Sequence, residues 1–594
     1  MKQFWITFFG SIFGVVVGSV LAVILAAFLI VGMLASAVSG STSPTTLPGS
    51  STVLELDLRA ERLDSPSRSP FAFSEPLSVV EIVQTLEQAE FDPAVHGLFI
   101  RANEFGLSPG MAEEIRDAIA DFRASGKFVI THAQGFEGTS VTAYLAVAGS
   151  DEIWLQDTAS FTPAGLASEV LFLGGMFEQF NAEPQFEQFF EFKNAANVYT
   201  QTGFTDAHRE ATLSYMNSIF DTAIADIAND RDITPEALRS TFETAPHSAE
   251  DALERGLIDH LGHVIDAREA ALARSGSGSQ LLAIEAYHSL LNPSSRGPAI
   301  ALIEGQGAIV TGTASASPLG GGGGIGSDAM SEAILDAAND TSIRAILIRV
   351  DSPGGSAIAS DQVWNAIGRA REAGKPVIIS MASVAASGGY YLAAPADYIL
   401  AHATTLTGSI GVLGGKVALE GTFEMAGLHS ESVHVGGDYA TAFSGQQSWT
   451  EAQRAAFRAQ MADTYDDFTR RVADGRDLPL ERVLEIARGR VWTGAQALDL
   501  GLVDEIGGFR DAVDATKHLA GLAPEDDVRL VRFPRQQTPI EAFSALFGMS
   551  AETAETAIRV NAVLDLPEVR AALEARSQIG SGQIQLRSTA PQPD

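Results

Sequence analysis

A serine in the second half of the chain stands where nothing bulky surrounds its hydroxyl. In the segment SVAASGGYYLAAP, residues 383–395, Ser387 follows two alanines and precedes Gly388 and Gly389. The run before it, KPVIISMA, has the apolar, β-branched composition of a buried strand. A hydroxyl at the end of such a strand is open to the carbonyl of a substrate, which suits it to nucleophilic acyl chemistry.

A second pair of glycines ends another predicted strand, in RVDSPGGSA at residues 349–357. Ligands of α/β proteins bind where neighbouring strands end at one edge of the sheet. Because glycine lets a backbone N–H approach a substrate without an intervening side chain, the amides of Gly355 and Gly388 could hold an oxyanion beside Ser387. The alternative is a tight packing motif in which Ser387 only caps a helix.

The elements that would position these residues occur twice in the chain. DPAVHGLFIR, starting at residue 92, matches DTSIRAILIR, starting at residue 340, and ALERGLIDHLG, starting at residue 252, matches ALDLGLVDEIG, starting at residue 497. Each copy alternates apolar β-branched runs with helical patterns, as stacked βαβ units do. We therefore expect an α/β fold with two tandem copies, residues 45–290 and 295–522.

The N-terminal residues predict a membrane anchor. After Lys2 no charged residue occurs before Glu55, and the apolar stretch between them exceeds the roughly 20 residues that span a bilayer. A cleaved signal peptide is the alternative, but its apolar region runs only about 7–15 residues. We expect one transmembrane helix within residues 1–42, with the positively charged N-terminus in the cytoplasm and the bulk of the chain outside the inner membrane.

The C-terminal end carries helical patterns followed by a polar tail. We expect residues 523–594 to form a helical extension whose end is disordered.

Composition excludes several classes of function. Asp and Glu number 74 against 39 Lys and Arg, and the net charge of −35 would repel nucleic acid phosphates. Nucleic acid binding is therefore excluded. The chain has no cysteine, which excludes disulfides, thiol catalysis and cysteine metal sites.

Three motifs in order, DSPGGS, AASGGYY and TLTGSIGV, resemble those of the signal peptide peptidase A family, also called protease IV. The resemblance covers nearly the whole chain and implies a ClpP/crotonase-like fold in each copy. It implies that Ser387 is the nucleophile, that Gly355 and Gly388 form the oxyanion hole, and that Ser409 helps to orient a lysine general base. No metal or cofactor is implied.

The same resemblance implies a biological setting. Members of the family degrade signal peptides left in the membrane after their release from preproteins. For this chain it implies apolar peptide substrates, a bacterial inner membrane with the bulk of the chain in the periplasm, and a homo-oligomer, a tetramer.

The base must be one of six lysines, and it must be desolvated, because an amine near its ordinary pKa of about 10.4 cannot accept the serine proton. The six are Lys2, Lys127, Lys193, Lys375, Lys416 and Lys517. We favour Lys193 over Lys416, since Lys193 follows Phe189, Phe190 and Phe192 and matches the lysine of the family. Two features depart from this expectation: Glu191 would raise the pKa of Lys193 if close, and Asn194 stands where the family has a serine.

The repeat offers a check on this assignment. Ser140 of the first copy aligns with Ser387, but valine and threonine follow it instead of two glycines. Lys193 falls opposite Tyr439 of the second copy. The first copy thus lacks the glycines beside its serine, and the second copy lacks the lysine. Each retains what the other lacks, which predicts an active site divided between them.

Three other functions compete with this interpretation. A Ser-His-Asp hydrolase could use His402, which lies in AHATTLTGS. A crotonase-like acyl-CoA enzyme would share the fold and the glycine amides, but an outward-facing chain would meet little coenzyme A. A catalytically inactive membrane scaffold is the third, since fold alone does not fix function.

Overall fold

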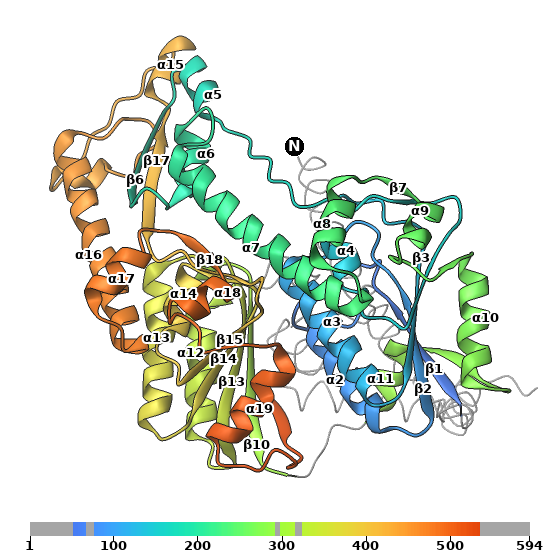
Figure 1. The fold of residues 1–594 in the computed structure, drawn as a ribbon. Helices are drawn as coiled ribbons and strands as arrows, with labels where there is room; N and C mark the ends of the chain where they lie inside the picture. The colour runs from blue at the N-terminus through green and yellow to red at the C-terminus, as the bar shows by residue number, and fades with distance from the viewer. Residues whose placement is uncertain (1–50, 67–75, 292–296, 315–323, 535–594) are drawn as a thin grey trace, which may run out of the picture.

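Two mainly parallel β-sheets lie side by side in the computed structural model (Figure 1). The structure describes residues 51–66, 76–291, 297–314 and 324–534. The predicted anchor, residues 1–42, and most of the predicted C-terminal extension lie outside these ranges. No helix within them is long and apolar enough to cross a membrane.

The first copy is built on a six-stranded sheet with the order β8-β4-β3-β2-β1-β9. Its strands are β1 (Thr52–Asp57), β2 (Val95–Arg101), β3 (Phe128–Ala133), β4 (Glu152–Leu155), β8 (His260–Leu261) and β9 (Gln280–Ala283). The helices that connect and cover them are α2 (Val79–Phe91), α3 (Pro109–Ala124), α4 (Thr142–Leu145), α8 (Pro235–Glu243), α9 (Ala249–Glu254), α10 (Val264–Ser275) and α11 (Ile284–Leu290). A short antiparallel pair, β5 (Ser160–Phe161) and β7 (His247–Ser248), lies beside this sheet.

The second copy is built on an eight-stranded sheet with the order β18-β16-β14-β13-β10-β20, in which β15 also pairs with β14 and β19 with β15. Its strands are β10 (Ala299–Gln306), β13 (Ile343–Ser352), β14 (Val377–Ala386), β15 (Tyr398–Ala401), β16 (Leu406–Gly408), β18 (Val491–Thr493), β19 (Glu505–Ile506) and β20 (Arg529–Phe533). Its helices are α12 (Ser327–Asn339), α13 (Ala357–Glu372), α14 (Gly388–Ala393), α17 (Leu480–Ile486), α18 (Gly494–Asp499) and α19 (Phe509–Leu519). A two-residue pair, β11 (Ile309–Val310) and β12 (Ile325–Gly326), precedes α12.

The two sheets repeat one topology. The order β8-β4-β3-β2-β1-β9 recurs as β19-β15-β14-β13-β10-β20, and every neighbouring pair in both series is parallel. This confirms the predicted tandem α/β duplication. Strand β20 flanks β10 as β9 flanks β1, so the second sheet continues past residue 522, where the sequence suggested a helical extension.

Central strands of each sheet are buried on both faces. In β13, IRAILIRVDS, eight of the ten residues are buried, as expected of a parallel strand covered by helices on both sides. The copies also share a core, because Phe509 and Ala512 of α19 pack in the same apolar cluster as Leu86 and Ile115 of the first copy. The two copies are therefore packed as one body.

A projecting arm joins the copies. Strand β6 (Glu183–Phe189) of the first copy pairs antiparallel with β17 (Val412–Ala418) of the second. The remaining helices of this region are α5 (Gly174–Gln179), η1 (Asn194–Ala196), α6 (Asn197–Thr200), α7 (Asp206–Arg231), α15 (Glu420–Met425), η2 (Asp438–Thr441) and α16 (Glu451–Arg476). Figure 1 shows the β6–β17 pair above the second sheet, and α7 running from there back to the first sheet. The segment of the first copy that follows β6 therefore lies over the second copy.

Candidate active site

Ser387 lies between the end of β14 and the start of α14 in a conformation that is rare for a side-chain-bearing residue. Its φ is 54° and its ψ is −119°. The Ser387 N–H donates to the Gly408 carbonyl at 2.8 Å, which ties the turn to β16. Ser387 occupies the N-cap position of α14, but its side chain makes no capping hydrogen bond. The hydroxyl is thus not used as a helix cap.

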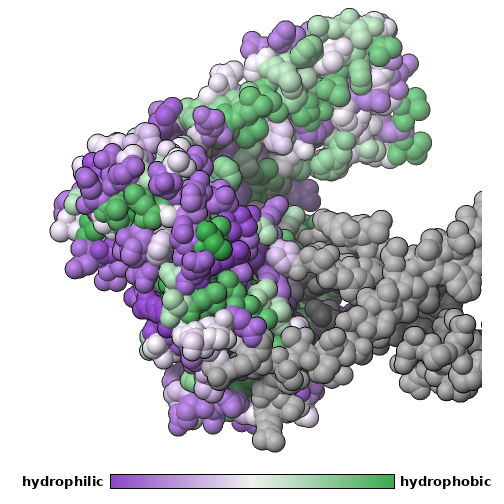
Figure 2. Space-filling view, turned by 90° about the vertical axis from the view of Figure 1, so that its right-hand side faces the viewer, coloured by the Kyte–Doolittle hydropathy of each residue, from purple (hydrophilic) through white to green (hydrophobic). Residues whose placement is uncertain are grey.

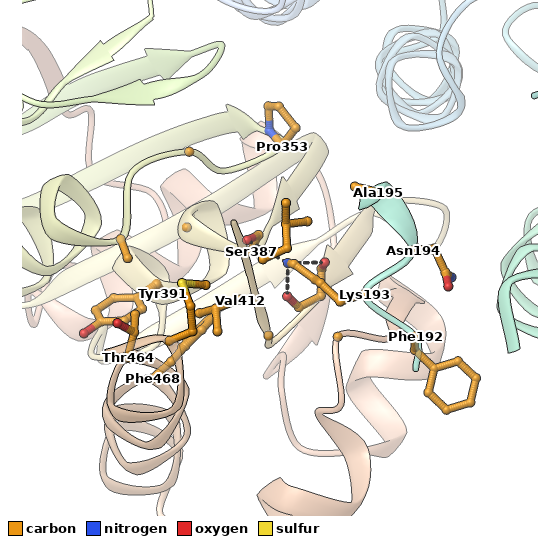
Figure 3. A pocket seen from close by; sticks show the side chains of 18 of the residues that line it. Phe192, Lys193, Asn194, Ala195, Pro353, Ser387, Tyr391, Val412, Thr464 and Phe468 are labelled. Carbon is orange, nitrogen blue, oxygen red and sulfur yellow. Dashed lines mark hydrogen bonds between the residues drawn. The ribbon is translucent and has the colours of Figure 1, made fainter. Parts of the chain in front are cut away.

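The Ser387 hydroxyl instead meets Lys193, which comes from the other copy. Lys193 Nζ lies 2.9 Å from Ser387 Oγ, 2.9 Å from Ser409 Oγ and 2.8 Å from the Ser409 carbonyl oxygen (Figure 3). A neutral amine has two N–H groups and one lone pair. If the two N–H groups donate to the carbonyl and hydroxyl of Ser409, the lone pair is left to accept the proton of Ser387 Oγ.

Burial shifts the pKa of Lys193 into the range that a general base needs. Its residue is 6% exposed, and this burial lowers the pKa of Lys193 to about 7. Glu191 does not oppose the shift, since its carboxylate pairs with Arg488 at 2.8 Å. Of the three phenylalanines that the sequence suggested as its cover, Phe189 is buried, whereas Phe190 is 43% exposed and Figure 3 shows Phe192 pointing away from Lys193. The expectation that all three cover the lysine is therefore not met.

Two backbone amides stand beside the serine. Gly354 has a φ of 101°, and an added Cβ there would lie 2.8 Å from Ser387 Cβ, so only glycine fits this close approach. The Gly355 nitrogen would lie 3.2 Å from a Cβ added at Gly388, which places the two predicted amides side by side. Gly388 is the first residue of α14, where N–H groups lack intrahelical acceptors.

Asp351, in the same motif as these glycines, was not singled out from the sequence. Its carboxylate accepts from the Val384 N–H at 3.1 Å and from Gln306 Nε2 at 3.2 Å. Burial raises the pKa of Asp351 to about 6. The side chain ties the end of β13 to the segment that leads to Ser387, and its place within DSPGGS was the available signal.

A cavity of about 740 Å³ surrounds Ser387 and Lys193. Figure 3 shows Tyr391, Val412, Thr464 and Phe468 gathered on one side of Ser387, with Asn194 and Ala195 beyond Lys193 on the other. Its lining is mainly apolar, and both copies contribute to it. The cavity is therefore large and apolar enough to hold apolar groups beside Ser387.

The other candidates from the sequence lie elsewhere. Lys416 Nζ donates to the carbonyls of Ser444 and Gln447 at 2.9 and 2.6 Å, which holds a loop of the arm. His402 is buried and lies 2.8 Å from Glu114 of the first copy. It does not line the cavity around Ser387. The geometry thus gives no support to a triad through His402.

In the first copy, the position that corresponds to Ser387 is surrounded by other side chains. Ser140 Oγ bonds to Thr142 Oγ1 at 2.8 Å, and an added Cβ at Gly106 would lie 2.8 Å from the same Thr142 oxygen. Tyr439, opposite Lys193 in the repeat, is 39% exposed on the arm. No group of three or more His, Cys, Asp or Glu side chains suited to a metal ion occurs among the residues that the structure describes.

A strand-end serine beside a buried amine, in an apolar cavity of a duplicated α/β protein, is the arrangement of a serine hydrolase. Comparison with known proteins narrows this class. The model of peptidase family S49 matches residues 121–278 and 369–523, one match in each copy and more than half of the chain together. The chain belongs to peptidase family S49 and is a serine protease, which confirms the resemblance drawn from the three motifs.

Similar proteins span much of the chain. Protease 4 of Salmonella typhi is 30% identical over 462 residues, covering 75% of this chain and 72% of its own. The chloroplastic serine protease SPPA of Arabidopsis thaliana is 28% identical over 510 residues, covering 84% of this chain and 74% of its own. The solved structure of a ClpP1 mutant from Listeria monocytogenes aligns with 36% of this chain and 94% of its own, at 16% identity and a TM-score of 0.23.

Proposed function

We propose that this protein is a membrane-anchored serine endopeptidase that degrades residual signal peptides with a Ser387/Lys193 dyad. The observation that carries the proposal is the 2.9 Å approach of Lys193 Nζ to Ser387 Oγ within a buried, mainly apolar site. A lysine whose pKa is lowered to about 7 is half neutral at physiological pH and can accept the serine proton.

In the first half of the reaction, Ser387 Oγ attacks the carbonyl carbon of the scissile peptide bond while its proton passes to Lys193 Nζ. The carbonyl oxygen becomes an oxyanion, which accepts hydrogen bonds from the amides of Gly355 and Gly388. When the C–N bond breaks, the departing amine takes the proton from Lys193. An ester between the substrate acyl group and Ser387 remains.

In the second half, neutral Lys193 removes a proton from a water molecule as that water attacks the ester carbonyl. A second oxyanion forms in the same place and collapses by breaking the bond to Ser387 Oγ, which takes the proton back from Lys193. The products are a free carboxyl end and the regenerated enzyme. Ser409 holds the amine in place throughout by its hydroxyl and carbonyl oxygens.

Apolar residues in the cavity and on the surface of the arm support apolar peptides as the substrates. Tyr391, Phe457, Met461 and Phe468 line the cavity. Apolar residues also gather on the projecting arm, as Figure 2 shows, and Leu428, Val433 and Val435 are 59%, 96% and 100% exposed there. Such an exposed apolar surface suits contact with a membrane, another subunit or an apolar peptide.

The location and the assembly follow from the sequence and the resemblance. We place the N-terminus in the cytoplasm, the bulk of the chain in the periplasm of a bacterium, and the protein in a homo-oligomer, a tetramer. Protease added to spheroplasts should then digest the bulk of the chain. Protection of that bulk until the inner membrane is broken would contradict this topology.

The direct test of the activity is turnover of a synthetic signal peptide by purified variants. Ser387→Ala should abolish cleavage and remain folded, whereas Ser140→Ala, its counterpart in the repeat, should cleave at the wild-type rate. Lys193→Ala should also be inactive, with Lys517→Ala as a matched control on α19. Cleavage by Ser387→Ala at a rate close to that of the wild type would refute the proposal.

A further inference from the structure

Three consecutive residues of the second copy, Arg488, Gly489 and Arg490, lie between Ser409 and the loop that carries Lys193. On the Ser409 side, the Ser409 N–H donates to the Arg490 carbonyl at 2.7 Å, and the Gly489 N–H donates to the Ile410 carbonyl at 2.8 Å. The segment is therefore fixed to Ser409, which contacts the Lys193 amine, and to its neighbour Ile410.

The arginines hold the first copy on the opposite side. Arg488 pairs with Glu191 at 2.8 Å, and its carbonyl accepts from the Phe190 N–H at 3.3 Å. Arg490 pairs with Glu210 of α7 at 2.7 Å. Arg488 thus binds residues that come just before Lys193 in the chain, and Arg490 binds the helix that follows it.

Aromatic contacts reinforce these two ion pairs. The guanidinium carbon of Arg488 lies 5.5 Å from the centre of the Phe190 ring. That of Arg490 lies 4.9 Å from the Phe192 ring and 4.5 Å from the Trp492 ring. These distances are those of cation–π contacts. The sequence suggested Phe190 and Phe192 as part of the cover of Lys193. In the structure Arg488 holds the Phe190 ring, and Arg490 holds the Phe192 ring.

Gly489 fits against the backbone of Lys193 itself. A Cβ added at Gly489 would lie 2.5 Å from Lys193 Cβ and 2.6 Å from Lys193 N, closer than atoms can approach. Its φ of +80° also favours glycine. A larger residue would therefore push Lys193 away from Ser387.

The repeat shows that this arrangement is specific to the second copy. At the offset of 245 residues that aligns the adjoining segments, Glu243, Thr244 and Ala245 stand in the first copy where the second has Arg488, Gly489 and Arg490. The first copy has neither the arginines nor the glycine at these positions, and the second copy has Tyr439 where the first has Lys193. The three residues thus occur in the copy whose Ser387 meets a lysine from the other copy.

We propose that residues 488–490 form an inter-copy clasp that positions Lys193 against Ser387 and Ser409. This inference rests on the proposed function, and it assigns the three residues as positioning residues rather than catalytic ones. The two arginines fix the loop on both sides of the lysine, and the glycine sets how closely Lys193 approaches.

The first test replaces Gly489 with alanine in the full chain. Gly489→Ala should lower kcat about 100-fold with little change in KM, because a displacement of about 1 Å at the reacting groups costs that much. The matched control is Gly374→Ala: Gly374 has the same φ of +80°, but no atom lies within 4 Å of an added Cβ. The control carries the same backbone penalty without the collision and should keep the wild-type kcat.

The second test reverses charges and remains informative if Gly489→Ala fails to fold. Arg488→Glu would face Glu191 with a like charge and should lower kcat several-fold. The double variant Arg488→Glu with Glu191→Arg should restore it, which a merely structural loss would not do. Arg482→Glu, which breaks an exposed pair with Glu485 within α17, is the matched control and should leave kcat unchanged.

A readout that does not need peptidase activity separates this inference from the proposed function. Acetylation of Lys193 by acetic anhydride, followed by peptide mass spectrometry across pH, reports when the amine becomes neutral. The wild-type midpoint should lie near 7, and in Gly489→Ala it should move toward the ordinary lysine value of about 10.4. This shift without peptidase activity in the wild type would support the clasp and refute the proposed function. A midpoint near 7 with unchanged kcat in both Gly489→Ala and Arg488→Glu would overturn the clasp.

Discussion

The pKa values of two buried basic side chains in this protein are shifted in opposite directions, and their surroundings explain why. Lys193 contacts only hydroxyl and carbonyl oxygens, so burial lowers its pKa to about 7. Burial would also lower the pKa of His402, but the carboxylates around it, foremost that of Glu114, raise this pKa to about 9. His402 is therefore charged at neutral pH and unsuited to act as a base, whereas Lys193 is suited to that role.

The pH dependence of kcat/KM should follow the titration of Lys193. The protonated amine cannot accept the proton of Ser387, so kcat/KM for an uncharged peptide should rise with pH, with a midpoint near 7, and then level off. Rates measured from pH 5.5 to 9 at constant ionic strength would check this. A rate that falls as the pH rises from 6 to 8 would contradict a neutral lysine base.

At the scale of elements, a buried ion network fastens the copies together. Arg349 of β13 is 1% exposed, and its Nη2 lies 2.7 Å from Asp64 and 2.8 Å from Glu114, both in the first copy. Glu114 also accepts from His402 Nε2 and from the Phe509 N–H, each at 2.8 Å. Every charge in this network has a partner, which is the condition under which buried charges are tolerated.

Removal of Arg349 should destabilise the whole protein. Arg349→Met would leave the buried Asp64 carboxylate without its cation and Glu114 with His402 alone. Loss of one partner of a buried pair costs about 3–5 kcal/mol. Urea unfolding should detect this loss, while Arg482→Met, in an exposed pair, should change stability by no more than about 1 kcal/mol. A loss below about 1 kcal/mol for Arg349→Met would mean that the network does not hold the copies together.

Much of the fold and part of the site were accessible from the sequence because they depend on local pattern. Apolar strands followed by glycines predicted the strand ends at Gly355 and Gly388, and the repeat predicted two α/β copies. The pairing of β6 with β17 joins segments more than 200 residues apart, and no local pattern encodes it. For the same reason the clasp around Lys193 was missed, although the difference between RGR and ETA in the two copies was visible in the sequence.

At the scale of the whole molecule, the packing of the copies brings Ser387 and Lys193 together within one chain. The first and second copies share a core through α19, and the β6–β17 ribbon carries the lysine across. The contact between Ser387 and Lys193 is therefore formed within one chain.

Mixed oligomers can test this completeness. Co-expression of full-length Ser387→Ala with full-length Lys193→Ala should give no peptidase activity, because every chain then lacks one member of its own dyad. Recovery of a measurable fraction of the wild-type activity would show that serine and lysine meet between chains. Co-expression of either variant with the wild type provides the positive control for assembly.

The most direct measurement of the central claim is the location and rate of covalent labelling by a serine-reactive acyl probe, read by peptide mass spectrometry. In the wild type the adduct should form on Ser387 and nowhere else, and in folded Lys193→Ala the labelling rate at Ser387 should collapse because no amine accepts the proton. An adduct on another serine, or equally fast labelling of Ser387 without Lys193, would contradict an active site in which one copy provides the nucleophile and the other provides the base.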